Sequence, residues 1–439
     1  MALDSLAANY RTPLYVYSET QIVDRYNLFT QAFRHRPHMI CYSVKANSNL
    51  SILKLLANHG SGFDIVSGGE LERVLRASKT SAKGVVFSGV GKTAPEIDLA
   101  LKAAILIFNV ESEGEVALLA ERAERLRTRA RVALRVNPDI VAETHPYIST
   151  GLREHKFGVD IRRAREVYQE INRSRYLEPV GVSVHIGSQI RSAEPFGAAM
   201  ERVASLVRQL EDDGIKIRYV DAGGGLGIDY QGGTAESGVS GPTSDPESNA
   251  PIQGQEQRRK KSKKEDPSFD PAAEIKRYAD SIDRALRGMK VKLLLEPGRF
   301  IVAQAGALLT QVLYVKQNGS KTFVITDAGM NDLLRPSLYD AYHEILPVDR
   351  DEAARLQTVD IVGPVCESGD FFARDRPMQT VQPGDLVAIL DTGAYGLSLS
   401  SNYNSRPRPA EVLVRGKKAR LVRRREKVKE LFAAEAPLL

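Results

Sequence analysis

The sequence predicts an α/β protein in which a (β/α)8 TIM barrel is followed by an all-β domain. Eight short apolar runs recur between residues 38 and 297, and most are followed by a segment with helical periodicity. Apolar, β-branched runs that alternate with helices are typical of parallel sheets, and eight such units are typical of a barrel. After residue 305 the runs are separated by turns with little room for crossover helices, which is typical of an all-β domain.

The barrel strands are predicted where the apolar runs lie, and the clearest helix is the amphipathic segment 112–129. In chain order the runs cover residues 38–44, 62–67, 84–90, 104–110, 131–137, 181–187, 217–223 and 291–297.

The second domain is predicted from four further strands, which the N-terminal strand 13–18 ("PLYVYS") joins. We expect these four strands within residues 307–317, 321–329, 358–368 and 384–396. The predicted division of the chain is an N-terminal strand and helix at 1–34, the barrel at 35–305, the β domain at 306–420, and a basic tail at 421–439.

Residues 231–270 interrupt the barrel pattern between its seventh and eighth units. This segment is rich in Gly, Ser, Pro and charged residues and has scarcely any apolar residue. Because it cannot bury enough apolar surface to offset the entropy of ordering, we expect a disordered surface insertion.

Composition limits the possible partners and compartments. The net charge is +6, but residues 411–439 alone carry nine Lys and Arg against four Glu, so the excess lies in the tail and we expect no nucleic-acid partner. No apolar stretch is long enough to span a membrane, and the N-terminus lacks a signal segment, so we expect a cytoplasmic protein. The two cysteines, Cys41 and Cys366, do not imply a disulfide framework.

Chemically useful side chains stand where the barrel strands end, which is where barrel enzymes place their active sites. They include Lys45, Asp64, Ser67, Ser88, Arg135, Asn137, His185, the glycines of "DAGGGLG" (221–227), Glu296, Gly298 and Arg299. A strand-end lysine is ordinarily a solvated charge, a lone histidine is ordinarily a satisfied core group, and a Gly-rich turn is ordinarily just a turn. Together they offer an amine, an imidazole, a carboxylate and a phosphate cradle, a set that suits pyridoxal 5'-phosphate.

Ten motifs in order resemble those of the diaminopimelate decarboxylase family, a group of pyridoxal-phosphate enzymes with an alanine-racemase-like barrel and a β domain. The motifs are "TPLYVYS", "YSVKAN", "GFDIVSGGE", "HPYISTGLREHKFGV", "VHIGSQI", "DAGGGLGIDY", "EPGR", "RPSLYDAYHEI", "GPVCESGD" and "GAYG". The resemblance spans nearly the whole chain apart from 231–270 and the tail.

The resemblance implies a role for each matching residue. Lys45 would bind the cofactor covalently, and a site of low dielectric would help to supply its neutral amine. The other cofactor contacts would be His185 on the ring, Ser188, Gly224 and Gly225 at the phosphate, Glu296 at the pyridine nitrogen, and Gly298, Arg299 and Tyr395. The substrate contacts would be Arg299, Arg335, Tyr339, Glu367 and Tyr395.

The same resemblance implies a homodimer with shared active sites, in which Cys366 and Glu367 reach the site from the partner subunit. Cys366 would donate the proton to the product. The implied reaction is the decarboxylation of meso-2,6-diaminopimelate to L-lysine, without a metal.

Two alternatives stay open at this stage. A decarboxylase of the same fold that acts on ornithine, arginine or carboxynorspermidine would share Lys45, His185 and Cys366. Glu367 suits a distal ammonium, and the pair Arg335 and Tyr339 suits a distal carboxylate that ornithine lacks, so diaminopimelate is favoured. A non-catalytic pyridoxal-phosphate-binding barrel is the other alternative, although it would need no proton donor.

We expect deletion of residues 235–266 to leave folding and dimerisation intact, because the segment is too polar to contribute to a core. Thermal unfolding and sedimentation of the shortened chain, compared with the full chain, provide the measurement. Loss of soluble protein would show that the segment packs against the barrel.

Overall fold

The computed structural model describes residues 2–140, 156–230, 269–349 and 355–439. Nearly all of the segment predicted to be a disordered insertion, residues 231–268, lies outside the described residues. So does part of the motif at 145–159, from residue 145 to residue 155.

Eight parallel strands form a closed barrel, which confirms the predicted fold class. The first barrel strand, β2, pairs with the last, β10, and the ring is completed by pairing between β5 and β6. The barrel strands are β2 (His38–Ser43), β3 (Gly62–Ile65), β4 (Val85–Phe87), β5 (Ile107–Val110), β6 (Ala130–Asn137), β8 (Leu177–Ser183), β9 (Tyr219–Asp221) and β10 (Lys292–Leu295). A short strand, β7 (Val159–Asp160), pairs with β6 at the rim.

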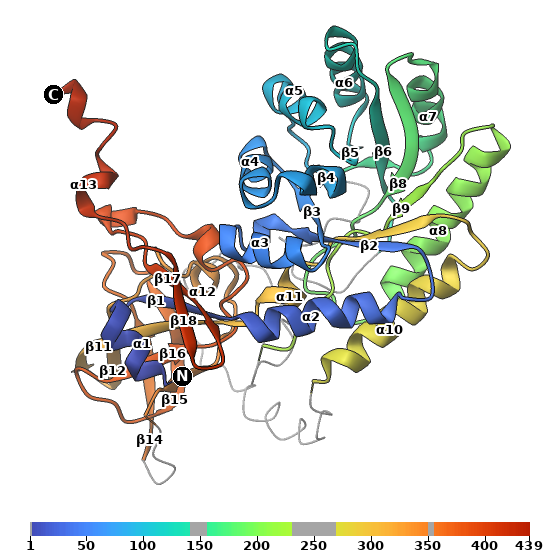
Figure 1. Ribbon diagram of the computed structural model, residues 1–439. Coiled ribbons are helices and arrows are strands. Elements are labelled where there is room, and N and C mark those ends of the chain that lie inside the picture. The colour runs from blue at the N-terminus through green and yellow to red at the C-terminus, as the bar shows by residue number, and fades with distance from the viewer. Residues whose placement is uncertain (1, 141–155, 231–268, 350–354) are drawn as a thin grey trace, which may run out of the picture.

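Helices cover the outside of the barrel (Figure 1). The longer helices bury one apolar face, as α6 (Glu113–Arg125) does with Val116 and Leu119. Ser112 caps this helix by accepting a hydrogen bond from the Glu115 amide. The others are α2 (Glu19–Ala32), α3 (Leu50–Asn58), α4 (Gly68–Ala77), α5 (Ala94–Ala103), α7 (Ala164–Arg173), α8 (Glu194–Asp212), α10 (Pro271–Ala285) and α11 (Arg299–Val302).

The second domain is a mixed sheet beside the barrel, and the N-terminal strand belongs to it as predicted (Figure 1). Strand β1 (Leu14–Ser18) pairs antiparallel with β11 (Gly306–Asn318) and parallel with β17 (Ala410–Arg415). The other strands are β12 (Lys321–Thr326), β13 (Ile345–Pro347), β14 (Leu356–Val362), β15 (Phe371–Gln379), β16 (Leu386–Ile389) and β18 (Lys418–Arg423), and the short helices are α1 (Leu3–Tyr10), α12 (Arg335–Tyr339) and α13 (Val428–Leu431).

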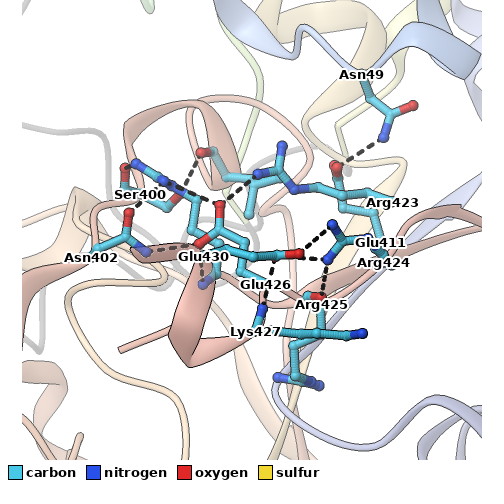
Figure 2. A network of polar contacts seen from close by, with 12 residues as sticks. Asn49, Ser400, Asn402, Glu411, Arg423, Arg424, Arg425, Glu426, Lys427 and Glu430 are labelled. Carbon is cyan, nitrogen blue, oxygen red and sulfur yellow. Dashed lines mark hydrogen bonds and ion pairs between the residues drawn. The ribbon is translucent and has the colours of Figure 1, made fainter. Parts of the chain in front are cut away.

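The basic C-terminal segment is partly tied to the β domain. Strand β18 extends past residue 420, where we expected the tail to begin, because it pairs with β17 as far as Arg423. The Glu426 carboxylate then accepts hydrogen bonds from Asn402 at 2.8 Å and from Arg408 and Arg423 at 3.3 and 3.1 Å (Figure 2). The domain boundaries otherwise stay a prediction.

The β domain is joined by hydrogen bonds to the loop that follows β2 in the barrel. The amide of Tyr395 donates to the Ala46 carbonyl at 2.8 Å, and the Asn47 side chain donates to the Gly393 carbonyl at 3.0 Å. A side chain at residue 393 would lie 1.9 Å from the Val302 carbonyl oxygen, so this close approach requires glycine. The loop after Lys45 is therefore held from both domains.

Glu411 on β17 makes a buried polar contact at this interface. Its carboxylate is buried and accepts hydrogen bonds from Tyr17 and from Asn49, each at 2.8 Å (Figure 2 shows the contact with Asn49). Asn49 in turn caps α3 by accepting from the Ser51 amide. One carboxylate thus links the β domain to the first helix after Lys45.

We expect Glu411→Ala to lower the free energy of unfolding by about 2 kcal/mol or more, because it leaves two buried donors without an acceptor. The midpoint of thermal unfolding measures the effect. The matched control is Glu121→Ala on α6, whose side chain is 66% exposed and should change stability by less than about 0.5 kcal/mol. Equal midpoints for the two variants would contradict the interpretation of Glu411 as an interdomain link.

Candidate active site

A cavity of about 530 Å³ lies at the carboxyl ends of the barrel strands. Its size suits a small-molecule site. Ten of the thirteen residues predicted for the site line it: Lys45, His185, Ser188, Gly225, Glu296, Gly298, Arg299, Arg335, Tyr339 and Tyr395. The barrel contributes the first group of these residues, and the β domain contributes the last three.

Lys45 lies directly after β2 and faces a carboxylate from the next strand. Its ammonium is 3.0 Å from Asp64 Oδ2, which also accepts a hydrogen bond from Ser43 at 2.7 Å. Asp64 is fully buried, whereas the Lys45 side chain is 38% exposed.

The structure corrects the expectation of a neutral amine at Lys45. Burial alone would lower the pKa of this amine, but Asp64 and the other negative groups around it outweigh burial and raise the pKa above its ordinary value. Lys45 is therefore a cation beside Asp64, and it must lose a proton before it can act as a nucleophile.

Glu296 and Asp221 form a buried carboxyl pair behind the lysine. Burial raises the pKa of both groups, and each is hydrogen-bonded to the other. Ser88 donates to Glu296 at 3.3 Å, and Asn109 donates to Asp221 at 2.7 Å. Two carboxyl groups this close do not ionise together, so the pair retains a proton. A proton held at the cavity wall is available to a basic ring nitrogen of a bound group.

His185 follows β8 and is held by the backbone of the glycine turn. The Gly224 amide donates to its Nδ1 at 3.1 Å, so this nitrogen is unprotonated. Burial, with the positive charges of Arg135 and Lys45, lowers the pKa of His185 well below its usual range. The imidazole is neutral and presents an uncharged ring to the cavity.

The glycine turn after β9 tests whether the site fits a phosphate group. A Cβ at Gly224 would lie 2.2 Å from the Glu296 carbonyl oxygen, and one at Gly225, where φ is +104°, would lie 2.3 Å from the Gly187 carbonyl oxygen. Only glycine permits this packing. The amides of Gly223, Gly224 and Gly227 donate to Asp221, His185 and Ile190, so the amides of Gly225 and Leu226 are the ones left to bind a ligand. The turn, the amine of Lys45 and the carboxyl of Glu296 together fit pyridoxal phosphate.

Two arginines, Arg299 from the barrel and Arg335 from the β domain, form a second part of the cavity lining, the arginine wall, and Tyr230 lies between them. Arg299 Nη1 donates to the Tyr230 hydroxyl at 2.5 Å, and the guanidinium of Arg335 lies 4.4 Å from the Tyr230 ring centroid. Arg299 also donates to Ser188 at 3.2 Å. An aromatic ring between two guanidinium groups keeps both cations near each other at reduced electrostatic cost, so the wall suits an anionic ligand.

Cys366 and Glu367 do not line this cavity. Both are exposed on the loop after β14, where Asn404 Oδ1 accepts from the Cys366 amide at 3.0 Å. Gly224 likewise is not a wall residue, since its amide faces His185. The predicted roles of the individual residues stay predictions.

Sequence reasoning missed several residues that line or shape the cavity. Glu70, in the first turn of α4, and Phe157 line it, and Tyr230 shapes it from behind. Glu70 could have been found, because it belongs to the "GFDIVSGGE" motif at the carboxyl end of β3. The ion pair between Asp64 and Lys45 could not have been found from the sequence, because it depends on the pairing of β2 with β3.

Comparison with known proteins gives the same picture. The family model described as "Pyridoxal-dependent decarboxylase, pyridoxal binding domain" matches residues 19–246. The diaminopimelate decarboxylase of Pseudomonas fluorescens is 46% identical over 440 aligned residues, covering 100% of this chain and 96% of that protein. The chain belongs to the diaminopimelate decarboxylase family. Another similar member of this family, from Aquifex aeolicus, is 45% identical over 97% of this chain and 92% of that protein.

Solved structures of this decarboxylase family have the same fold over the full length. The structure of diaminopimelate decarboxylase from Helicobacter pylori, complexed with L-lysine, is 42% identical with a TM-score of 0.87 and 100% coverage of both chains. The enzyme from M. jannaschii, also in complex with L-lysine, is 38% identical with a TM-score of 0.85, covering 98% of this chain and 93% of that one. Among the described residues of this chain, no helix is long and apolar enough to span a membrane.

We expect Glu70 to make stability depend on pH. Burial, with Asp64 nearby, raises the pKa of Glu70 to about 7, above the value of about 4.3 in an unfolded chain. The stabilisation from its proton is fully present below about pH 4.3 and is lost as the pH rises to about 7. Glutamine is uncharged at every pH, so Glu70→Gln keeps this stabilisation where the wild-type carboxyl loses it. The variant should therefore gain thermal stability over the unsubstituted chain between pH 5 and pH 8. The exposed Glu72→Gln on the same helix is the control, and parallel pH curves for all three proteins would refute the expectation.

Proposed function

We propose that the protein catalyses the decarboxylation of meso-2,6-diaminopimelate to L-lysine and carbon dioxide, the last step of lysine biosynthesis, with pyridoxal 5'-phosphate as cofactor. The observation that carries the proposal is that one cavity is lined by Lys45, Glu296, a glycine turn and two arginines. Relatives of this chain that are 43 to 46% identical over nearly its whole length are diaminopimelate decarboxylases.

The barrel side of the cavity would hold the cofactor. Lys45 would bind its aldehyde carbon, the turn around Gly225 with Ser188 would receive the phosphate, and the Glu296 carboxyl would face the pyridine nitrogen. The neutral ring of His185 would stack on the cofactor without adding a positive charge. Pyridoxal phosphate supplies an electron sink that accepts the electron pair left when carbon dioxide departs.

The ion pair of Asp64 and Lys45 involves the proton that the Lys45 amine must lose before it can react. The ion pair would orient the amine toward the cavity, and Asp64 would hold the Lys45 ammonium whenever it is not bound to the cofactor. Glu70, on the same side, has a carboxyl with a pKa of about 7, so it can exchange a proton near neutral pH.

The arginine wall would select the substrate. Diaminopimelate carries two carboxylates, one of which leaves as carbon dioxide, whereas the other stays in the product. Arg335 with Tyr339, and Arg299 nearby, would bind the carboxylate that stays. Tyr395, whose ring lies 5.0 Å from the Arg299 guanidinium, would add a hydroxyl between the cofactor and the substrate.

The site would be completed by a second copy of the chain. Cys366 and Glu367 are exposed, outside the cavity of their own chain, and the family resemblance assigns them to the partner's site as proton donor and as ligand of the distal ammonium. A homodimer with shared active sites follows from this proposal. The cytoplasmic location and the lack of a nucleic-acid partner are further predictions from the sequence.

A carbon dioxide release assay tests the function. The holoenzyme is supplied with meso-diaminopimelate, ornithine, arginine or carboxynorspermidine, and we expect release from diaminopimelate alone. Lys45→Ala should abolish turnover and remove the adduct that borohydride reduces, because it removes the amine assigned to the cofactor. Release from another of the four substrates would replace the substrate assignment, and cofactor absorbance without any release would favour a non-catalytic binding protein.

Cys366→Ala should retain cofactor absorbance but lose turnover, whereas Cys41→Ala, at the buried thiol of β2, should at most lower stability. Mixing inactive Lys45→Ala chains with inactive Cys366→Ala chains should restore part of the activity, because a mixed dimer has one site with both residues intact. Mixed dimers that are confirmed by mass and remain inactive would show that Cys366 does not act across the interface.

A further inference from the structure

His343 is a buried histidine that contacts Arg335 of the arginine wall. It lies just after α12, the helix that carries Arg335 and Tyr339, and its exposed fraction is 0%. It is not among the residues that line the cavity. Buried histidines need a partner at both ring nitrogens, so its contacts show what it does.

The two hydrogen bonds of His343 define one tautomer. Its Nδ1 is 2.7 Å from the Leu390 carbonyl oxygen, which can only accept, so Nδ1 carries the hydrogen. Its Nε2 is 2.8 Å from Arg335 Nη1, which can only donate, so Nε2 presents a lone pair. A single neutral imidazole satisfies both contacts.

A charged His343 is incompatible with this environment. A protonated ring would point an N–H at the N–H of Arg335 and place two cations 2.8 Å apart. Burial and the neighbouring Arg335 accordingly lower the pKa of His343 well below its usual range. The ring of Tyr230 packs edge-on against His343, at a centroid separation of 5.3 Å, and limits its movement.

Two contacts therefore hold the Arg335 guanidinium in place. Its guanidinium lies over the Tyr230 ring, and one of its nitrogens is held by His343. Arg335 is itself 98% buried, so its direction is decided by such contacts and not by solvent. A guanidinium that is fixed before a ligand arrives loses little freedom on binding a carboxylate.

We propose that His343 is a positioning residue for substrate selection: as a neutral acceptor it holds the Arg335 guanidinium in the orientation that receives the carboxylate retained in the product. The inference deepens the proposed function and rests on the role given there to Arg335. It assigns to His343 no contact with the substrate.

Two substitutions separate the two contacts of the ring. Asparagine at residue 343 can still donate to the Leu390 carbonyl in the manner of Nδ1, but it does not reach Arg335. Glutamine can place an acceptor near the position of Nε2. We therefore expect His343→Asn to raise the KM for meso-diaminopimelate about tenfold with kcat within about twofold, and His343→Gln to recover most of the loss.

An equilibrium measurement distinguishes positioning from general damage. L-Lysine has the carboxylate that Arg335 would bind, whereas 1,5-diaminopentane has none. In the holoenzyme, His343→Asn should weaken L-lysine binding about tenfold and leave 1,5-diaminopentane binding unchanged. The matched control is His38→Asn, since His38 Nδ1 is likewise 3.0 Å from a carbonyl oxygen, that of Arg36, but lies away from the cavity. Equal weakening of both ligands, or no weakening, would overturn the proposal.

A double substitution shows whether His343 acts through Arg335. If it does, Arg335→Ala raises the KM, and adding His343→Asn to Arg335→Ala raises it no further. Additive losses would overturn the positioning role. If Arg335→Ala itself leaves the KM and L-lysine binding unchanged, the failure lies in the substrate role proposed for Arg335, which is a separate outcome from a failure of His343 alone.

Discussion

The hydrogen bonds between the β domain and the loop after Lys45 are the constraint on which the site depends. Ala46, Asn47 and Asn49 follow Lys45 directly, and each is tied to a residue of the β domain. The segment that carries Lys45 is therefore held by hydrogen bonds from the β domain as well as by the barrel. The same contacts join the two domains whose residues line the cavity, since Arg335, Tyr339 and Tyr395 come from the β domain.

Burial determines the protonation states of the ionisable groups that the barrel contributes to the site. The barrel side retains a proton on the pair of Glu296 and Asp221 and keeps His185 neutral, because charged forms of these groups are costly in a buried site. Lys45 departs from this rule because Asp64 compensates its charge. The barrel side thus combines the ion pair of Lys45 and Asp64 with a neutral imidazole and a carboxyl pair that shares one proton, an arrangement suited to a cofactor that carries both a phosphate and a basic ring.

The charges of the arginine wall are accommodated in a different way. Its two guanidinium groups cannot lose their charge, so they are accommodated by the Tyr230 ring and by neutral acceptors such as His343. A cationic surface that is rigid before binding favours a ligand with a fixed anionic group over one without it. Discrimination between a diamino diacid and an amino acid with one carboxylate then depends on how well Arg335 is held in place.

The sequence by itself determined the barrel, the β domain and most of the cavity wall. Apolar runs that recur with helical segments depend on local periodicity, and the rule that barrel sites lie at strand ends turns a list such as Lys45, His185 and Glu296 into a site. Tertiary structure alone decided the contacts of Glu411 and His343. The contacts of Glu411 join segments far apart in the chain, and those of His343 depend on which ring nitrogen faces which group. No local pattern in the sequence encodes how the β domain comes to pack against the loop after Lys45.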